Sequence, residues 1–325
     1  MSPASRGKRT DPERRDWIES SKKRRSSDAA AAVFEGPDSW ACMNEDLLRV
    51  VAWRVLAGEF ADYIRLRAVS RHWRSSTVCP RGRGVVDPRF HPRHWRMLPE
   101  GYRLYPGHTK LSGRARFFNL RTGSFASVCL PLFEDHLALD SVDGLLVVHR
   151  VHDTAVRLLH PFTGDIVELP LLSTLLPQLA PLVNPDELYV PEDTHDYLVE
   201  LTREIVAAVS FSPNGAITAM LAFHCGYVSR VAFATSEDQQ WTLSSWETGS
   251  IGSTIPFQGK LYFCDEQNQV FVVDPHLQEG EKELGSPPAL SSLPPPKLIA
   301  TFPSGIQDPY LVECDSEYRQ PEPSV

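Results

Sequence analysis

The sequence predicts an α+β chain of several domains, in which a small three-helix module precedes a larger, mainly-β, propeller-like domain. Apolar residues recur at helical spacing within residues 44–74. From residue 116 onward, short β-branched and aromatic runs alternate with turn residues. Similar turn sequences return about 40 residues apart, the length expected for four-stranded propeller blades.

Residues 1–38 are predicted to form a disordered basic tail, because charges and serines dominate and apolar periodicity is absent. The basic run from Lys22 to Arg25 is typical of a nuclear import signal or of a solubilising tail. Six cysteines are scattered without a Cys-x-x-Cys pair, as in a reducing compartment. We therefore expect the nucleus, the cytoplasm or both.

Residues 39–76 are predicted to form the helical module. Asn44 can cap its first helix, whose acidic first turn suits the helix dipole, and Gly58 ends it. Two shorter patterns follow, in residues 60–66 and 69–73. The first helix carries a wide apolar stripe: Leu47, Leu48, Val51, Ala52, Val55 and Leu56. Three short helices cannot bury so much apolar surface among themselves, so we expect part of it to dock on a partner.

Residues 77–115 are basic and interrupted by prolines. They fit either a patch for phosphates or an acidic partner, or a linker that packs on the next domain. The linker is favoured, because aromatic residues such as Trp95 and Tyr102 lie between the basic ones.

Residues 116–315 are predicted to form the propeller-like domain, and residues 316–325 a disordered tail. The expected strands cover 116–120, 124–130, 145–149, 156–159, 166–169, 205–211, 216–224, 230–235, 241–246, 259–264 and 269–273. Segments 171–200 and 277–297 interrupt this series and are expected to form insertions.

Two internal echoes support a repeat. Thr122-Gly123 and Thr163-Gly164 are 41 residues apart, and each precedes a strand that closes with Leu-Pro. Gly144 and Gly259 open similar strands 115 residues apart, which is close to three units of about 40. A β-sandwich is the alternative architecture.

Charge limits the functions that the chain can have. Residues 1–118 hold 24 Lys and Arg against 13 Asp and Glu, whereas residues 119–325 hold 9 against 28. The large domain is therefore acidic, and broad binding to nucleic acid is not expected. No apolar run is long enough to span a bilayer, so we expect no contact with a membrane.

The sequence offers little sign of catalysis. It contains no Gly-x-Ser-x-Gly elbow, no phosphate loop and no His-Glu-x-x-His motif. The close histidine pairs, His91 with His94 and His149 with His152, lack partner ligands at metal-site spacing. We therefore expect no catalytic residues, no metal and no cofactor.

The helical stretch resembles an F-box. The matching residues are Trp40, Glu45-Asp46, Leu47-Leu48 and the closing Val69-Ser70-Arg71-His72-Trp73-Arg74. Met43-Asn44 stand where Leu-Pro is usual, so the resemblance implies that the fold is preserved and that binding to the partner is weaker.

The remainder resembles the F-box-associated β-propeller of unknown function that is expanded in plants, chiefly grasses. The residues that carry this likeness are Asp143-Gly144-Leu145-Leu146, His160-Pro161-Phe162-Thr163-Gly164, Phe257-Gln258-Gly259-Lys260-Leu261-Tyr262 and Tyr310-Leu311-Val312-Glu313. Relatives continue with another strand pair, whereas this sequence becomes proline-rich, so we expect an incomplete last blade.

The two resemblances imply a non-catalytic, substrate-recruiting subunit of an SCF-type cullin–RING ubiquitin ligase. The helices would dock on the SKP-type linker subunit and the β domain would bind a protein substrate. The residues expected at the linker are Met43, Leu47, Leu48, Val51, Val55, Val69 and Trp73. Several of them, Trp73 above all, are also expected to hold the helices together.

Three other functions remain open. The basic tail and three helices fit a nuclear DNA-associated regulatory protein. A propeller lectin or hydrolase would show a metal or a carboxylate cluster at its central channel. A degenerate family member would fold poorly.

Overall fold

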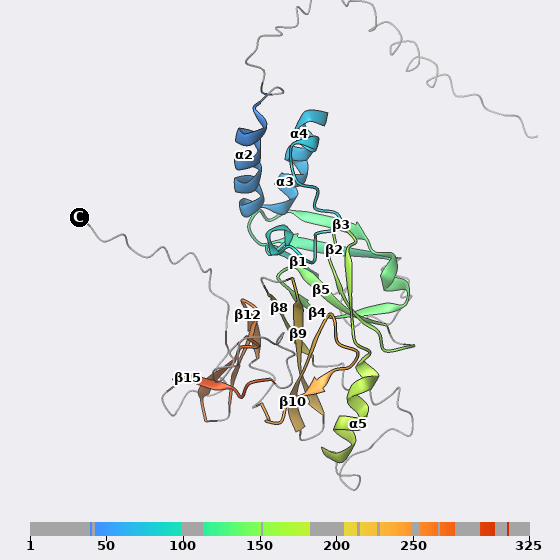
Figure 1. Cartoon of the computed structure of the whole chain (residues 1–325), viewed down its shortest axis with the longest axis vertical. Helices are drawn as coiled ribbons and strands as arrows, with labels where there is room; N and C mark the ends of the chain where they lie inside the picture. The colour runs from blue at the N-terminus through green and yellow to red at the C-terminus, as the bar shows by residue number, and fades with distance from the viewer. Residues whose placement is uncertain are drawn as a thin grey trace, which may run out of the picture.

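Helices and four antiparallel sheets make up the described part of the computed structural model (Figure 1). Three helices stand at one end of the molecule beside the first sheet, and α5 lies at the opposite end. The predicted tails at residues 1–38 and 316–325, with the basic run, lie outside the described residues. The structure describes residues 40, 43–98, 113–150, 152–182, 205–212, 215–225, 228–248, 254–265, 267–276, 293–302 and 311.

The three helices predicted near the start are present as α2 (Glu45–Gly58), α3 (Phe60–Arg67) and α4 (Arg71–Ser75). The Asn44 side chain caps α2 by accepting a hydrogen bond from the Asp46 amide at 2.8 Å. Ser70 caps α4 in the same way, accepting from the Trp73 amide at 3.1 Å. These local caps explain why the helix starts could be read from the sequence.

The β strands form four sheets in chain order. The first sheet contains β1 (Trp95–Met97), β2 (Arg114–Asn119) and β3 (Phe125–Cys129). The second contains β4 (His136–Val142), β5 (Leu145–Arg150), β6 (Val156–Leu159) and β7 (Ile166–Leu169). The third contains β8 (Val206–Phe211), β9 (Ile217–Cys225), β10 (Val228–Thr235) and β11 (Thr242–Leu243). The fourth contains β12 (Ile255–Phe257), β13 (Lys260–Cys264), β14 (Gln269–Val273) and β15 (Lys297–Thr301).

This mainly-β, propeller-like arrangement confirms the predicted class of the larger domain. Within each four-stranded sheet the strands lie in sequence order, so each sheet is a meander of hairpins. Short helices connect β7 to β8, namely η6 (Leu172–Leu175), α5 (Leu176–Leu179) and η7 (Ala180–Leu182). Their buried leucines join the main core between the second and third sheets.

Four strands were not predicted, for local reasons. β1 lies in the segment assigned to a linker, and β4 contains Asp140 and is flanked by Asp135 and Asp143, a residue type that is common in turns. β12 has a central proline, and all five residues of the edge strand β15 are exposed. The β domain therefore begins with β1, before residue 116, and it uses Trp95 as a buried core residue.

The two pairs of similar segments mark equivalent turns, but the predicted number of repeat units between Gly144 and Gly259 is wrong. Gly123 lies between β2 and β3 and Gly164 between β6 and β7, one sheet later, as the repeat predicts. Gly144 and Gly259 begin the second strands of sheets two and four, so two units separate them rather than three. The long connection from β7 to β8 accounts for the extra length.

The segment on which the expectation of an incomplete last blade rests, after Phe302, lies outside the described residues except for Leu311. The last described sheet, β12 to β15, has all four strands, whereas the first sheet has only three. The sequence pattern could not show these strand numbers, because β1 is only three residues long and β15 is exposed throughout.

Gly144 is expected to tolerate no side chain. Its φ is +81°, and a Cβ atom there would lie 2.1 Å from the Pro92 carbonyl oxygen. We expect Gly144→Ala to cost about 3 kcal/mol of unfolding free energy, from backbone strain and the displaced segment. Gly164→Ala is the matched control, since its φ is +75° and no atom lies within 4 Å. Urea unfolding measures the unfolding free energy of both variants. Equal losses of unfolding free energy would contradict a clash at Gly144.

Candidate protein-docking site

Helix α2 presents apolar side chains in two directions. Leu48, Ala52 and Leu56 face inward and are buried. Leu47, Val50 and Val51 are exposed, with 62%, 55% and 39% of their surface accessible. Residues three and four apart share one side of a helix, so these three form a single outward patch. The wide stripe predicted from the sequence is therefore divided between a core and an exposed surface.

The rest of the helical module adds to the exposed apolar surface. Ile64 on α3 and Val69 after it are 41% and 61% exposed, and Trp40 before α2 is 77% exposed. We call these six residues the exposed apolar set: Trp40, Leu47, Val50, Val51, Ile64 and Val69. Exposed apolar residues gathered on so small a module are typical of a surface that binds another protein.

The residues predicted to contact a partner fall into three classes. Leu47, Val51 and Val69 are exposed. Met43, Val55 and Trp73 are half-buried and pack on the core of the module, which also includes Leu48. The fully buried Leu48 supports the helices in this conformation.

Two exposed residues were missed by the sequence analysis. Val50 lies three residues after Leu47, and Ile64 lies four residues after Phe60 in α3. Helical spacing could have identified both residues if the apolar positions had been divided into an inward-facing and an outward-facing stripe.

Glu59 joins the helical module to the first sheet. Its carboxylate is buried between α2 and α3, where it accepts hydrogen bonds from Trp95 Nε1 at 2.7 Å and Asn119 Nδ2 at 2.8 Å. It also accepts from the Ala61 amide at 3.2 Å, which caps α3. One residue therefore ends α2 through its backbone amide, and its side chain caps α3 and holds two strands of the β domain.

Aromatic rings complete this junction. Phe162, in the turn between β6 and β7, lies 5.9 Å from Phe60, 5.2 Å from Trp95 and 5.4 Å from Phe117 between ring centroids. The turn sequence from His160 to Gly164, noticed as a repeat, thus anchors the helices on sheets one and two. These ring contacts, with the Glu59 hydrogen bonds, join the helical module to the β domain.

His160 stabilises the same turn as a neutral imidazole. Its Nδ1 accepts from the amides of Phe162 and Thr163 at 3.3 and 3.0 Å, so Nε2 carries the hydrogen that is donated to the Phe90 carbonyl. Burial lowers its pKa. The hydrogen bonds occupy both ring nitrogens, so His160 has a structural role.

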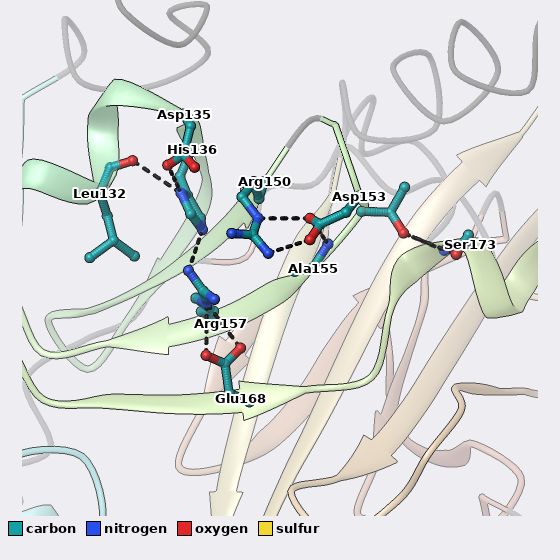
Figure 2. A network of polar contacts seen from close by, with 10 residues as sticks. Leu132, Asp135, His136, Arg150, Asp153, Ala155, Arg157, Glu168 and Ser173 are labelled. Atoms are coloured by element: carbon teal, nitrogen blue, oxygen red, sulfur yellow. Dashed lines mark hydrogen bonds and ion pairs between the residues drawn. The ribbon is translucent and has the colours of Figure 1, made fainter.

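Figure 2 shows a polar network on the second sheet. His136 contacts Asp135 and the Leu132 carbonyl through Nδ1, and its Nε2 accepts from Arg157 Nη1 at 2.9 Å. Arg157 Nε in turn lies 2.9 Å from both carboxylate oxygens of Glu168. Burial lowers the pKa of His136 despite the nearby Asp135. Because both imidazole nitrogens are engaged, the network ties strands together and offers no free base.

The nearby hairpin between β5 and β6 is held by Arg150 and Asp153. Arg150 Nε donates to Asp153 Oδ1 at 2.8 Å, and the second oxygen contacts Arg150 Nη2 (Figure 2). This ion pair lowers the pKa of Asp153 to about 2. The ion pair joins residues three apart in sequence and stabilises the turn between β5 and β6.

A cavity of about 630 Å³ lies where the first strands of sheets two, three and four end. Its wall includes Asp140, Ser210 and Gly259. Asp140 is occupied structurally, since its Oδ2 accepts from the Ala207 amide at 2.7 Å. Asp140 thus links β4 to β8, and Asp143 lies 3.9 Å from Arg93 Nε.

One serine–histidine contact borders this cavity. Ser210 Oγ is hydrogen-bonded to His276 Nε2. Asp274 accepts from the His276 backbone amide at 3.0 Å and pairs with Lys260, rather than orienting the imidazole ring. Among the described residues, this contact ties the end of β8 to the turn after β14.

Metal ligands do not gather in the described part of the chain, where no three His, Cys, Asp or Glu side chains could share an ion. The two histidine pairs noted in the sequence separate: His149 is buried while His152 is exposed, and His91 is buried while His94 is half-buried. Among the helices described, none combines the length and apolarity needed to cross a bilayer.

Buried His91 is expected to make stability depend on pH. Its Nε2 lies 2.9 Å from the Val85 carbonyl, and burial lowers its pKa to about 4. Between about pH 4 and 6.5 the unfolded chain therefore binds more protons, so the folded state loses stability as the pH falls. The loss is at most about 1.4 kcal/mol per pH unit for one histidine.

Urea unfolding between pH 7.5 and 5 measures this dependence. We expect His91→Asn to reduce the dependence of the unfolding free energy on pH. We expect His152→Asn, at an exposed position, to leave that dependence unchanged. The residual slope would come from His136 and His160, whose pKa values burial also lowers. An unchanged slope in the His91 variant would contradict the assignment.

Comparison with known proteins gives one match. The family model described as KIB1-4 beta-propeller matches residues 117–318, which is more than half of the chain. The match begins within β2 and extends past β15, so it covers the four-sheet domain except for β1 and the start of β2, and it excludes the helical module. No curated protein and no solved structure matches the chain.

Proposed function

Because the chain belongs to the KIB1-4 beta-propeller family, we propose that it recruits protein substrates to an SCF-type cullin–RING ubiquitin ligase. Helices α2 to α4 dock on the SKP-type linker subunit, and the propeller holds the target. One observation carries the proposal: α2 buries one apolar face completely and leaves Leu47, Val50 and Val51 in solvent. The F-box resemblance of residues 40–74 supplies the identity of the partner.

In this role the chain acts as a scaffold and breaks no bonds itself. Holding a target beside the charged conjugating enzyme raises the effective concentration of the reacting groups.

The junction at Glu59 supports the same role. A rigid joint fixes the distance and orientation between the linker-binding helices and the bound target. Glu59, Phe60 and Phe162 make that joint from buried hydrogen bonds and aromatic contacts, with no flexible segment between α2 and α3. The ligase assembles in the nucleus or cytoplasm in this proposal, and the basic run Lys22 to Arg25 would direct import.

Affinity purification of the tagged full-length chain tests the proposal, with and without proteasome inhibition. We expect an SKP-type linker and a cullin in both samples, and target proteins that accumulate when the proteasome is inhibited. A well-folded chain that recovers neither linker nor cullin would overturn the proposal. Salt-sensitive recovery of DNA in their place would favour the nuclear regulatory alternative.

A further inference from the structure

A second cavity lies at the junction between the helical module and the β domain. Its volume is about 430 Å³, and it opens where α2 ends and α3 begins, against the segment that leads into β1 (Figure 1). One wall comes from the segment 53–60 and the other from the segment 88–94. Cavities of roughly 300–1,000 Å³ at the boundary between two structural units are typical binding sites for small molecules. We call this space the junction cavity.

Apolar side chains make up much of the lining of the junction cavity. Leu56, Phe60 and Pro92 are buried, and Trp53 and Pro88 are half-buried. They come from both walls, so an occupant would contact the helical module and the β domain together. Aromatic and aliphatic side chains on facing walls favour a flat apolar group such as an aromatic ring.

Positive charge lies at the exposed part of the lining, on Arg89 and Arg93. The Arg89 guanidinium is already held, because it pairs with Asp87 at 2.9 and 2.7 Å and lies 4.3 Å from the centroid of the Trp53 ring. Arg93 is held less firmly, since its Nε lies 3.9 Å from Asp143 Oδ2. Arg93 is therefore the cation that can turn toward a bound anion.

The other ionisable groups of the lining do not cancel this charge. Glu59 is the only carboxylate among the lining residues, and it already accepts three hydrogen bonds. Burial lowers the pKa of His91 to about 4, so this imidazole is neutral at neutral pH. His94 can add positive charge but no negative charge. Two guanidinium groups therefore stand against one occupied carboxylate, and the lining has a net positive charge.

We propose that the junction cavity binds a small aromatic molecule that carries one negative charge. The ring lies against the apolar walls, near Leu56 and Phe60, and the anionic group faces Arg93 in the exposed part. A molecule bound there stabilises the same junction that Glu59 and Phe162 form. The proposal goes beyond the recruitment of substrates and does not depend on it.

Fluorescence titration of the folded full-length chain with anilinonaphthalene sulfonate tests the proposal. This probe is aromatic, carries one negative charge and gains fluorescence in apolar surroundings. We expect a saturable site and a melting temperature that rises with the probe concentration. Ala57→Phe places a ring in the cavity from an exposed position of α2, and should weaken binding on the order of tenfold. Ala68→Phe, at an exposed position outside the lining, is the matched control and should leave binding unchanged.

Phenylnaphthylamine, which has the same rings without the sulfonate, isolates the contribution of charge. Arg93→Gln should weaken binding of the sulfonate about fivefold and leave binding of the uncharged probe unchanged. Arg74→Gln, on α4 outside the lining, should change neither.

Three results would overturn the proposal. The first is a folded chain that shows no saturable binding of the sulfonate. The second is unchanged binding in an Ala57→Phe variant whose circular dichroism matches that of the unaltered chain, because the probe would then bind elsewhere, as on the exposed apolar set. The third is an equal effect of Arg93→Gln on both probes, because the site would then not select a negative charge.

Discussion

Replacing Leu47 and Val51 with aspartate is expected to abolish binding of the SKP-type linker while the chain stays folded. Both side chains are exposed, so the charges are solvated in the free protein. In the complex each charge would be buried without a partner, at a cost of about 3 kcal/mol or more. Each substitution alone should therefore weaken affinity on the order of 100-fold.

Two variants separate docking from folding. Leu120→Asp places the same charge on an exposed leucine of the β2–β3 turn, 59% accessible, and should bind the linker normally. Leu48→Ala removes a fully buried side chain next to Leu47 and should cost about 2–5 kcal/mol of stability. Calorimetric titration of purified linker gives the affinities, and circular dichroism reports the fold. Unchanged affinity in the folded Leu47 and Val51 double variant would refute the docking site.

Replacing Glu59 with alanine is expected to weaken the junction between helices and sheets more than any surface change. The substitution leaves the buried donors Trp95 Nε1 and Asn119 Nδ2 without their acceptor and removes the α3 cap. Unsatisfied buried donors cost about 1–3 kcal/mol each, and the cap about 1 kcal/mol, so we expect a total near 4 kcal/mol. The melting temperature should fall on the order of 10 °C.

Asp62→Ala is the matched control for this loss. Asp62 lies three residues away on α3 and pairs with Arg65 in solvent, so its removal should cost less than about 1 kcal/mol. The stability of the Glu59→Gln variant should lie between those of the Glu59→Ala and Asp62→Ala variants. The amide keeps one acceptor oxygen, but its NH2 group would face one of the two buried donors. Thermal unfolding followed by tryptophan fluorescence compares the three. Equal stability of the Glu59 and Asp62 variants would show that the buried carboxylate does not hold the junction.

Local chemistry made much of this fold predictable. Asn44 and Gly58 bound the first helix, and the Thr-Gly pairs mark turns of equivalent strands, because caps and tight turns depend on a few neighbouring residues. The strands over 156–159 and 166–169 were predicted with their observed bounds for the same reason. By contrast β4 contains Asp140 and β12 contains Pro256, residue types that are rare in strands, and both segments are extended because they pair with neighbouring strands.

The sequence by itself determined that apolar residues on the first helix exceed what three helices can bury. The tertiary structure decided which of them remain exposed: Leu48 turns inward and Leu47 outward, although they are adjacent and chemically identical. Periodicity gives the width of an apolar stripe, but which half is covered depends on the packing of α3, α4 and Phe90. Glu59 makes the same point, since its donors lie 36 and 60 residues away and only the folded chain brings them together.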